Sequence, residues 1–434
     1  MASAARRSRL PDAAPDPRRT PKPVEYNILL TATLCLLAAG AVMVYSASSA
    51  RTLLEGQGDG TAYLVKYLAF GAVGLVVLHL LARGGLGLLP RLTPGLLAVS
   101  FILLVIVKLP GIGVEINGAR RWIGAGPLQF QPSELMKLAL VLYATRLLST
   151  TPTRLRSLRD GAAGPLLLVA GAAIVLIASQ PDLGTSLVIA FTLGALLLVA
   201  GVPLGLLGRI AGVAAVLVVL FIVVEPYRAA RVTAFLNPWA HAASSGFQSV
   251  QGQIALGSGG LFGVGLGESV QKVFYLPEAH TDFILAVIGE ELGVAGVCGL
   301  LFLYGLIGYA GLRTAKAART RYTQLLAAGL TSLILCQALL NVFAVLGIAP
   351  LTGVPLPFIS SGSSSLLVLL ATMGLLLNVA SRSASHLASL PGPAERPGDA
   401  RGSRDGESAH RGGRDGRARG ARAGGRRAVE GGGR

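Results

Sequence analysis

Charged residues are scarce in this chain. Of its 434 residues only 14% are Asp, Glu, Lys or Arg, while 52% are hydrophobic and the mean hydropathy is +0.64. A soluble domain carries roughly 25% charged residues, so this composition excludes one. Apolar runs of about eighteen residues or more recur along almost the whole sequence, and each is long enough to cross a bilayer as a helix. The chain is therefore expected to be an integral membrane protein.

Cysteines and nucleotide-binding signals are also sparse. The three cysteines, Cys35, Cys298 and Cys336, lie inside apolar segments without metal-ligand spacing, which predicts buried thiols and no disulfides. The glycine-rich run GSGGLFGVGLG at 257–267 has no preceding strand and no Lys-Ser or Lys-Thr pair, so it does not fit a nucleotide-binding loop. It predicts a flexible, tightly turning re-entrant loop instead. No small-residue cleavage site follows the first apolar run, which is expected to stay as an anchor.

The apolar segments predict an all-α integral membrane protein, a polytopic bundle of about ten transmembrane helices. The expected spans lie near 27–46, 62–82, 90–108, 132–149, 164–180, 183–201, 204–225, 282–312, 323–347 and 358–381. Residues 1–25 are expected to form a disordered, basic cytoplasmic arm, and 384–434 a disordered Gly/Arg-rich cytoplasmic tail, because both are too polar to bury a core. The membrane domain is expected to cover 26–383.

The charge of the loops predicts how these helices are oriented. Lys and Arg collect in the loops after the fourth and eighth expected spans and in the tail after the tenth, and basic loops stay in the cytoplasm. Both termini are therefore expected to be cytoplasmic. The net charge of +17 fits this topology and contact with anionic lipid, and we expect no nucleic-acid partner.

This topology leaves three notable segments on the outer face, at 109–131, 225–281 and 348–357. The second is a long extracytoplasmic loop between helices 7 and 8, with a predicted amphipathic helix at Gly246–Leu256. Connections of this length are uncommon and are usually either functional or disordered. We therefore expect the functional site on the outer side of the membrane.

The stretch YLPEAHTDFILAVIGEELG at 275–293 gathers ionisable groups where a helix enters the membrane. Glu278, His280 and Asp282 lie at its outer mouth, and such groups are costly there and usually functional. The alternative for Asp282 is that it caps the helix by accepting free backbone N–H groups. Glu290 and Glu291 lie about 12 Å further along the helix at 1.5 Å per residue, which favours structural pairs within the bundle.

A second polar cluster lies at 117–137 and reads NGARRWIGAGPLQFQPSELMK. Arg120 and Arg121 are on the expected outer face, where they fit either contact with lipid headgroups or binding of an anion such as phosphate. Glu134 and Lys137 lie one turn apart on the fourth expected helix, and they fit equally a salt bridge within the bundle or a ligand site. Asp182 belongs to a polar elbow between two helices, where a structural and a functional role both remain open.

Several long motifs carry a resemblance to a known family. Residues 231–293 contain RVTAFLNPW, GFQSVQGQIALGSGGLFGVGLGESVQK and the 275–293 stretch, and NGARRWI, QPSELMK and GVPLPFISSGSSS lie elsewhere in the chain. Together they resemble the SEDS family (shape, elongation, division and sporulation) of integral-membrane peptidoglycan glycosyltransferases, over residues 27 to about 383. The YLPEAHTDF form, with Ala279, is more similar to the division branch than to the elongation branch, and a sporulation paralogue also fits. Ser361, Ser363 and Gly252 depart from the family pattern, which usually has tyrosine, glycine and serine there.

The resemblance implies polymerisation of lipid II, a disaccharide pentapeptide carried on undecaprenyl pyrophosphate, at the outer face of the membrane. The GlcNAc 4-hydroxyl of the acceptor would attack the anomeric carbon of a MurNAc and invert it, which suits a single base rather than the carboxylate pair of retaining hydrolases. Asp282 matches the family's essential acid. We expect it to be this base or a ligand of a divalent cation such as Mg²⁺ or Mn²⁺.

The leaving group of this reaction needs cationic partners as its charge develops. Arg120 and Lys137 are the expected pyrophosphate partners, with Arg121 and Lys272 as further candidates. Glu278 and His280, which lie near the base in the sequence, are expected to support it or to move its proton. The full set of expected substrate-binding residues is Arg120, Lys137, Arg121, Lys272, Glu278 and His280. Ser360, in the last motif, is assigned no chemical role.

The resemblance also implies partners and a location. Lipid II and undecaprenyl-pyrophosphate-linked glycan are the expected substrates, at the division septum of the cytoplasmic membrane. A class B penicillin-binding protein is expected to supply transpeptidation, and other divisome membrane proteins are expected to associate. Two other functions fit part of the sequence. A lipid II flippase explains basic residues in the membrane but does not need an acid at the outer surface, and a scaffold would recruit a transpeptidase without chemistry of its own.

Overall fold

The structure, a computed structural model, describes residues 22–54, 60–116, 118–126, 128–150, 163–223, 226–273 and 275–387. Its helices are α1 (Val24–Leu54), α2 (Ala62–Arg83), α3 (Leu89–Ile106), α4 (Pro132–Thr150), α5 (Ala163–Ala178), α6 (Leu183–Val199), α7 (Leu204–Val223), α8 (Pro226–Leu236), α9 (Phe247–Ser258), α10 (Ile284–Ala317), α11 (Arg321–Val345) and α12 (Ser363–Leu387). Two short 3-10 turns are η1 (Leu86–Leu88) and η2 (Trp239–His241). The predicted basic arm and Gly/Arg-rich tail lie almost entirely outside the described residues.

Each of the ten expected spans coincides with a helix, namely α1 to α7 and α10 to α12. Within the described residues seven of these helices are long and apolar enough to cross a membrane: α1, α2, α3, α7, α10, α11 and α12. The helices α5 and α6 are apolar but shorter, and α4 carries Glu134, Lys137 and Arg146 among its apolar residues. The chain is therefore a polytopic membrane protein. The predicted amphipathic helix at Gly246–Leu256 corresponds to α9.

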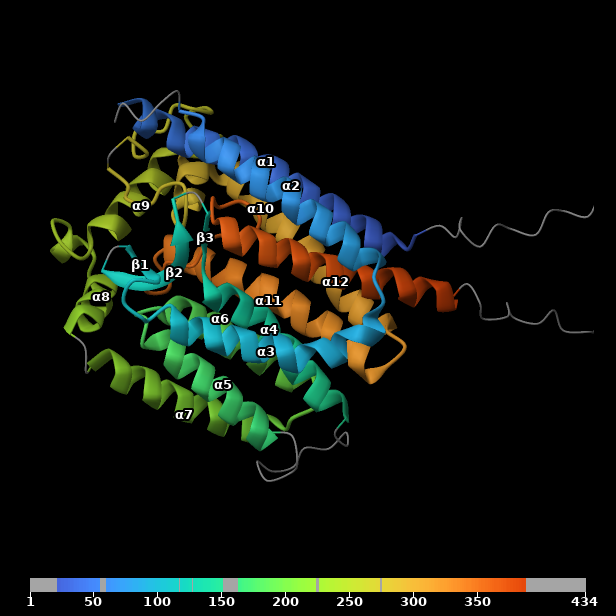
Figure 1. Cartoon of the computed structure of the whole chain (residues 1–434). Helices are drawn as coiled ribbons and strands as arrows, with labels where there is room; N and C mark the ends of the chain where they lie inside the picture. Colours follow the sequence, from blue (N-terminus) through green and yellow to red (C-terminus); the bar gives the residue numbers. More distant parts are fainter. Residues whose placement is uncertain are drawn as a thin grey trace, which may run out of the picture. The chain divides into compact units, whose positions relative to one another are not determined.

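The helices near the site pack closely. Figure 1 shows α10 alongside α1 and α11, and α12 alongside α2. The contact between α2 and α12 is tight because glycines lie in it. A Cβ at Gly74 would lie 2.3 Å from Leu370 Cδ1, and one at Gly374 would lie 2.7 Å from the carbonyl oxygen of Leu78. Small residues of this kind let transmembrane helices approach each other.

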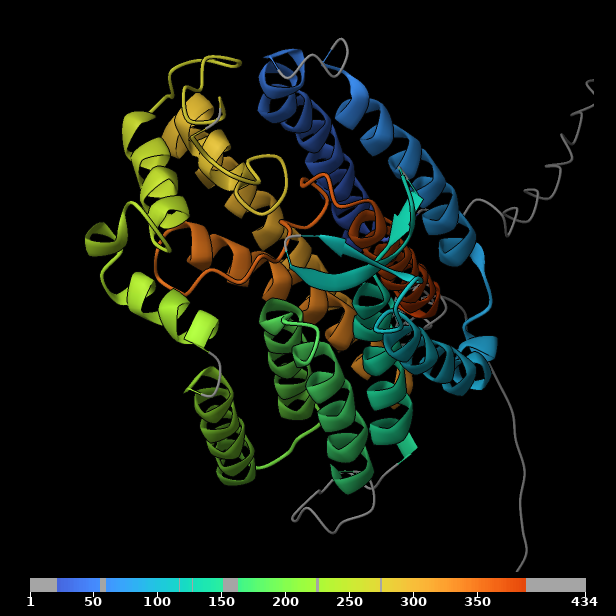
Figure 2. The same ribbon diagram turned by 60° about the vertical axis from the view of Figure 1, so that its left-hand side comes forward.

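The periphery of the bundle is apolar. Leu206 is the one buried residue of α7, which Figure 2 shows at the edge of the bundle. The length and hydropathy of α7 are typical of a membrane span, so its exposed apolar side chains are expected to face lipid. The prediction of buried thiols was wrong for Cys35 and Cys298, which are exposed. Their helix faces lie on the outside of the bundle, where an apolar side chain contacts lipid instead of protein.

Residues 109–131, which were predicted to lie on the outer face, form a small sheet that the sequence analysis did not anticipate. Its strands β1 (Gly113–Ile116), β2 (Ala119–Ala125) and β3 (Leu128–Phe130) pair antiparallel in chain order. The sequence between β1 and β2 is Asn-Gly, which favours two-residue hairpins, and Gly118 has a φ of 73°. Arg120 and Arg121 are neighbours on β2, so their side chains leave opposite faces of the sheet.

α10 is interrupted at Gly293, whose φ of 66° and ψ of −164° are not helical. Residues 259–265, which we call the glycine strap, lie against this break and bond its free backbone groups. The four bonds run from the N–H groups of Val264, Gly265, Val294 and Ala295 to the carbonyls of Glu290, Glu291, Gly260 and Leu261, respectively. The segment predicted as a tightly turning loop is thus fastened to α10 on both sides of the break. Irregular backbone beside a membrane helix requires such internal bonding.

Candidate functional site

Asp282 lies in the turn that leads into α10. The helix begins at Ile284, and its N-cap residue is Phe283, which has no side-chain cap. The capping alternative for Asp282 is therefore wrong, because the cap position belongs to its neighbour. Thr281 Oγ1 lies 2.9 Å from Glu278 Oε2 and 3.3 Å from Asp282 Oδ1, so its one hydrogen can bond to either carboxylate, and both carboxylates lie at the same turn.

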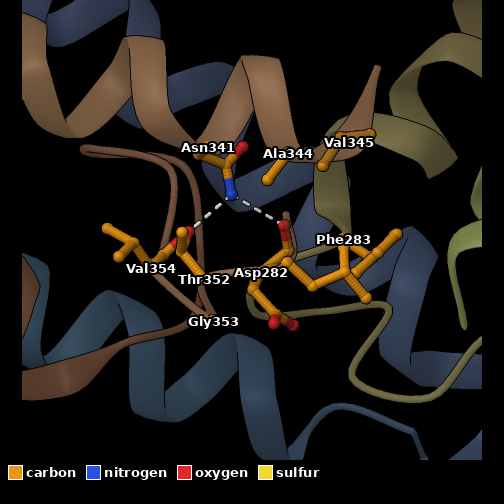
Figure 3. Close-up of a pocket in the computed structure, with 9 residues that line it drawn as sticks. Asp282, Phe283, Asn341, Ala344, Val345, Thr352, Gly353 and Val354 are labelled. Carbon is orange, nitrogen blue, oxygen red and sulfur yellow. Dashed lines mark hydrogen bonds between the residues drawn. The ribbon is translucent and has the colours of Figure 1, made fainter. Parts of the chain in front are cut away.

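A small pocket opens beside Asp282. Its walls are the turn before α10, one face of α11 and the segment 351–354, and its lining residues are Asp282, Phe283, Asn341, Ala344, Val345, Leu351, Thr352, Gly353 and Val354. Asn341 Nδ2 donates to the backbone carbonyls of Asp282 at 2.7 Å and Val354 at 2.8 Å. Figure 3 shows the Asp282 carboxylate pointing away from Asn341, on the side of Gly353.

The environment of Asp282 changes its acidity. Burial raises the pKa of this carboxyl to about 7, and the negative charge of Glu278 acts in the same direction. A backbone hydrogen bond, the Thr281 hydroxyl and the positive charge of Arg231 lower the pKa, but they do not outweigh the burial. A carboxylate whose pKa is near neutral can both hold and release a proton at physiological pH, as a general base must.

The turn before α12 fixes the backbone that precedes Asp282. Ser360 Oγ donates to the carbonyl of Thr281, and Ser361 donates to the carbonyl of His280 from its N–H at 3.1 Å and its hydroxyl at 2.8 Å. The tenth span was predicted to begin at 358, but α12 begins at Ser363. That boundary was wrong because these hydrogen bonds and the left-handed φ of Phe358, 64°, keep this turn out of the helix.

Aromatic side chains hold the same region. Tyr67 donates its hydroxyl to the carbonyl of Phe358, and Tyr304 donates to the carbonyl of Pro357 at 2.6 Å. The ring of Tyr63, on α2, packs on His280 with centroids 4.4 Å apart. The turn before α10 and the turn before α12 are therefore held together by α2 and α10, two elements far apart in the sequence.

The departure from the family pattern at Gly252 also lies at this site. A Cβ at Gly252, on α9, would lie 2.6 Å from Cε1 of Phe283. The aromatic ring thus occupies the space that a serine at 252 would need. The absence of a side chain at Gly252 therefore allows the ring of Phe283, the residue after Asp282, to occupy this position.

The two arginines of β2 have different partners. Arg120 forms an ion pair with Glu115 at 3.1 Å, and both side chains are about half exposed, at 45% and 54%. Exposed pairs of this kind contribute little free energy, so Glu115 holds the Arg120 side chain only weakly. Arg121 donates from Nε to the carbonyl of Gln180 at 2.9 Å and from Nη2 to that of Pro181. Its guanidinium thus joins the sheet to the elbow before α6.

Lys137 is buried in an ion pair. It lies 2.9 Å from Glu134 and donates to Gln337 Oε1 on α11 at 2.6 Å, and both charged side chains are only 2% exposed. Gln337 in turn donates to the carbonyl of Pro355 at 3.0 Å. An ammonium has three donors, and within the described residues Glu134 and Gln337 are the partners for two of them.

The acidic residues deeper in α10 bind to the outer loop and to α1. Lys272 lies 2.7 Å from Glu291 and also donates to the carbonyl of Gly267 at 2.7 Å and to Ser46 Oγ at 3.1 Å. The Ser46 hydroxyl donates to both oxygens of Glu291, and Glu290 accepts from Ser269 Oγ and the N–H of Val270. Lys272 therefore has a structural partner for each of its three donors, and its role in binding pyrophosphate stays a prediction.

Asp182 is a structural residue in this arrangement. It is the N-cap of α6 and accepts from the N–H of Thr185 at 3.1 Å. Its other oxygen accepts from Gln131 Nε2 at 3.0 Å and from Ser133 Oγ at 3.4 Å, at the start of α4. The carboxylate thus fastens the starts of two helices.

A divalent cation fits the site only with help from the substrate. Among the described residues no three His, Cys, Asp or Glu side chains converge. Asp282 and Glu278, which share the Thr281 hydroxyl, would be its protein ligands. Mg²⁺ is commonly held in this way, by one or two carboxylates together with water and substrate phosphates.

Three residues of this region were missed by the sequence analysis. Arg231, on α8, begins the motif RVTAFLNPW, and its positive charge lowers the pKa of Asp282. Gln337 and Asn341 lie one turn apart on α11. The signal for them was present, because amide side chains in an apolar span need hydrogen-bond partners from neighbouring elements.

Comparison with known sequences places the chain among cell-division and sporulation proteins. The model of the FtsW, RodA and SpoVE family, described as "Cell cycle protein", matches residues 27–385. Stage V sporulation protein E of Bacillus subtilis is 40% identical over 358 residues, which are 81% of this chain and 96% of the relative. A probable peptidoglycan glycosyltransferase FtsW of Trichlorobacter lovleyi is 41% identical over 356 residues, or 82% of this chain and 93% of the relative.

Solved structures are similar over the same region. One, described as "Structural coordination of polymerization and crosslinking by a peptidoglycan synthase complex", matches with a TM-score of 0.65 and 29% identity over 81% of this chain and 96% of that one. The crystal structure of the rod shape determining protein RodA from Thermus thermophilus has a TM-score of 0.61 and 29% identity, over 84% and 98%.

Proposed function

The chain belongs to the FtsW/RodA/SpoVE family of cell cycle proteins, and we propose a mechanism for it in which Asp282 is the catalytic base. It is a multi-pass membrane enzyme, a peptidoglycan glycosyltransferase that polymerises lipid II into glycan strands. The observation that carries the mechanism is the position of Asp282, partly buried at a pocket mouth with a pKa raised to about 7.

The reaction needs one proton to be removed and one leaving group to be stabilised. As the GlcNAc 4-hydroxyl oxygen forms a bond to the anomeric carbon, its proton passes to Asp282 and the bond from that carbon to the lipid pyrophosphate breaks. A well-placed general base accelerates such a step by roughly 10²–10⁴-fold. Glu278 keeps the pKa of Asp282 high, and His280 is the proposed outlet for the proton.

We propose Arg120 and Lys137 as the partners of the departing pyrophosphate. The exposed pair between Arg120 and Glu115 leaves the guanidinium fork available, and that fork matches two phosphate oxygens. Lys137 supplies buried positive charge from α4. Arg121 holds the elbow before α6 and is proposed to support the binding site rather than to bind substrate. If Asp282 instead binds a divalent cation together with Glu278, that ion would neutralise further pyrophosphate charge.

The proposed setting is the cytoplasmic membrane at the division septum, with both termini in the cytoplasm. A relative's structure concerns a synthase complex that combines polymerisation and crosslinking. We propose a class B penicillin-binding protein as the crosslinking partner, together with other divisome membrane proteins. The match to a sporulation protein at 40% identity supports sporulation as a second setting for the same chemistry.

The decisive experiment is the Asp282→Asn variant in purified, membrane-reconstituted protein supplied with lipid II. We expect glycan chain formation to fall by at least about a hundredfold, the lower range for a general base, with lipid II binding retained. The matched control is Glu268→Gln, which removes an exposed carboxylate from the same outer loop and should leave the rate unchanged.

The outcomes separate the candidate functions. Wild-type polymerisation by Asp282→Asn protein of normal thermal stability would remove this residue from the chemistry. Movement of lipid II across the vesicle membrane without polymer from the wild-type protein would favour the flippase, and neither activity would favour the scaffold.

A further inference from the structure

We propose that Asn341 is a positioning residue for Asp282. It lies on α11, is 2% exposed, and touches the backbone of Asp282 rather than its carboxylate. The inference rests on the proposed role of Asp282 as the base, and it assigns the geometry of that base to a residue on another helix.

The orientation of the Asn341 amide is fixed by its partners. Nδ2 donates to two carbonyl oxygens, those of Asp282 at 2.7 Å and Val354 at 2.8 Å. A carbonyl can only accept, so the nitrogen must face both of them. One side chain thereby uses both of its N–H donors to join two segments that are about seventy positions apart in the chain.

The two segments are opposite walls of the pocket. The first carries the base, and the second, 351–354, carries Gly353, whose φ is 66°. A Cβ built on Gly353 would lie 3.7 Å from Asp282 Oδ2, so the bare backbone of this wall runs beside the carboxylate. By bonding the next residue, Val354, Asn341 sets the separation between that wall and the base.

Gln337, one turn earlier on α11, donates to the carbonyl of Pro355 at 3.0 Å and accepts from Lys137 at 2.6 Å. The same outer segment is therefore held by two successive amides of one helix. Within the described part of the chain, Asn341 hydrogen-bonds to the backbone of the base, Asp282, whereas the hydrogen bonds of Gln337 do not reach that residue. Loss of Asn341 would free the base from α11 while Gln337 still held the wall.

This arrangement predicts a specific kinetic effect. Misplacement of a reacting group by about 1 Å can cost about a hundredfold in rate, whereas substrate contacts elsewhere persist. We expect Asn341→Ala to lower kcat by about tenfold to a hundredfold with KM within about threefold of wild type. Asn341→Asp keeps the shape but has no N–H to donate when ionised, and should lose kcat to a similar extent.

The chain offers a matched control in Asn378. This residue is equally buried, at 1% exposed, and its Nδ2 also donates to two carbonyls, those of Leu81 at 2.6 Å and Gly84 at 2.7 Å. Leu81 lies about 27 Å along α2 from Tyr63, at 1.5 Å per residue, and Tyr63 packs on His280. Asn378→Ala therefore removes the same kind of bond at the other end of the bundle.

The experiment measures kcat, KM for lipid II and melting temperature for Asn341→Ala, Asn341→Asp, Asn378→Ala and Asp282→Asn. Low kcat with normal KM in both Asn341 variants, and normal kcat in Asn378→Ala at a similar loss of melting temperature, supports the proposal. A normal kcat in Asn341→Ala, a loss confined to KM, or an equal loss of kcat in Asn378→Ala overturns it.

Two further arms keep these results interpretable. If Asn341→Ala does not fold, Asn341→Gln retains a buried amide but displaces its donors by one methylene. Low kcat at normal KM in that variant supports the proposal, and normal kcat overturns it. An active Asp282→Asn protein would refute the base itself, whereas an inactive one beside normal Asn341 variants would refute only the positioning role.

Discussion

The protonation state of one side chain, Asp282, sets the pH range of the enzyme. Because burial raises its pKa to about 7, only the ionised fraction can accept a proton from the acceptor hydroxyl. We expect kcat/KM for polymerisation to rise with pH and to level off above a midpoint near 7. Glu278→Gln should move the midpoint down and Arg231→Ala should move it up, since their charges act on Asp282 in opposite directions. Shifts in the same direction would contradict the electrostatic account.

The raised pKa of Asp282 also makes the stability of the folded protein depend on pH. The folded-state pKa, about 7, lies above the ordinary value of 3.8, so the folded protein binds the proton more tightly than the unfolded chain. This contribution to stability is complete below pH 3.8 and is lost as the pH rises through 7. Asp282→Asn cannot ionise and avoids that loss. Its melting temperature relative to wild type should rise between about pH 4 and pH 7, as thermal scans in detergent would measure.

At the scale of elements, the break in α10 and the glycine strap form one unit. A Cβ at Gly293 would lie 2.4 Å from the backbone nitrogen of Gly263, and the φ of 66° is unfavourable for any other residue. We expect Gly293→Ala to destabilise the protein by at least about 2 kcal/mol, because backbone strain of about 1–3 kcal/mol adds to the steric overlap. A drop in melting temperature together with lower polymerisation would be the measurable result.

Gly299→Ala is the control in the same helix. A Cβ there would meet nothing within 4 Å, and alanine favours a helix over glycine by about 1 kcal/mol. This variant should be as stable as wild type or slightly more stable. Equal losses from both substitutions would show that the strap does not depend on Gly293.

The elements that the sequence predicted well are those with a strong apolar signal. Long runs such as 204–225 need only length and hydropathy to be recognised, and α7 follows them closely. The start of α12 could not be predicted in this way. Residues from Phe358 onward are apolar enough for a span, but bonds from Ser360 and Ser361 to the turn before α10 hold them outside the helix.

The acidic residue of the site could be predicted from the sequence, but the residues that position it could not. Asp282 stood out because charge is rare in the chain. The pairing of Lys272 with Glu291 could not be predicted, because it depends on how the loop before α10 packs against that helix. Asn341 was missed because an amide in an apolar helix can face any neighbour until the packing of α10 against α11 is known.

At the scale of the whole molecule, the orientation in the membrane is the feature to test. The proposed topology places Glu268 outside and Arg319, after α10, inside, and both side chains are exposed. In a variant whose three native cysteines are replaced, we expect Glu268→Cys to react with a membrane-impermeant maleimide in intact cells. Arg319→Cys should react only after lysis. The reverse pattern would place Asp282 in the cytoplasm, away from the outer face where polymerisation is proposed.

The contact between the glycine strap and α10 has no room for a side chain at three of its glycines. At Gly259 and Gly263 a Cβ would lie 1.9 Å and 2.1 Å from backbone oxygens of α10, and at Gly293 one would lie 2.4 Å from the strap. Backbone cannot be repacked in the way that a side chain can, so a larger residue at one position has no compensating partner at another. We therefore expect every substitution at these three positions to destabilise the protein, because no change at one of them relieves the overlap at another.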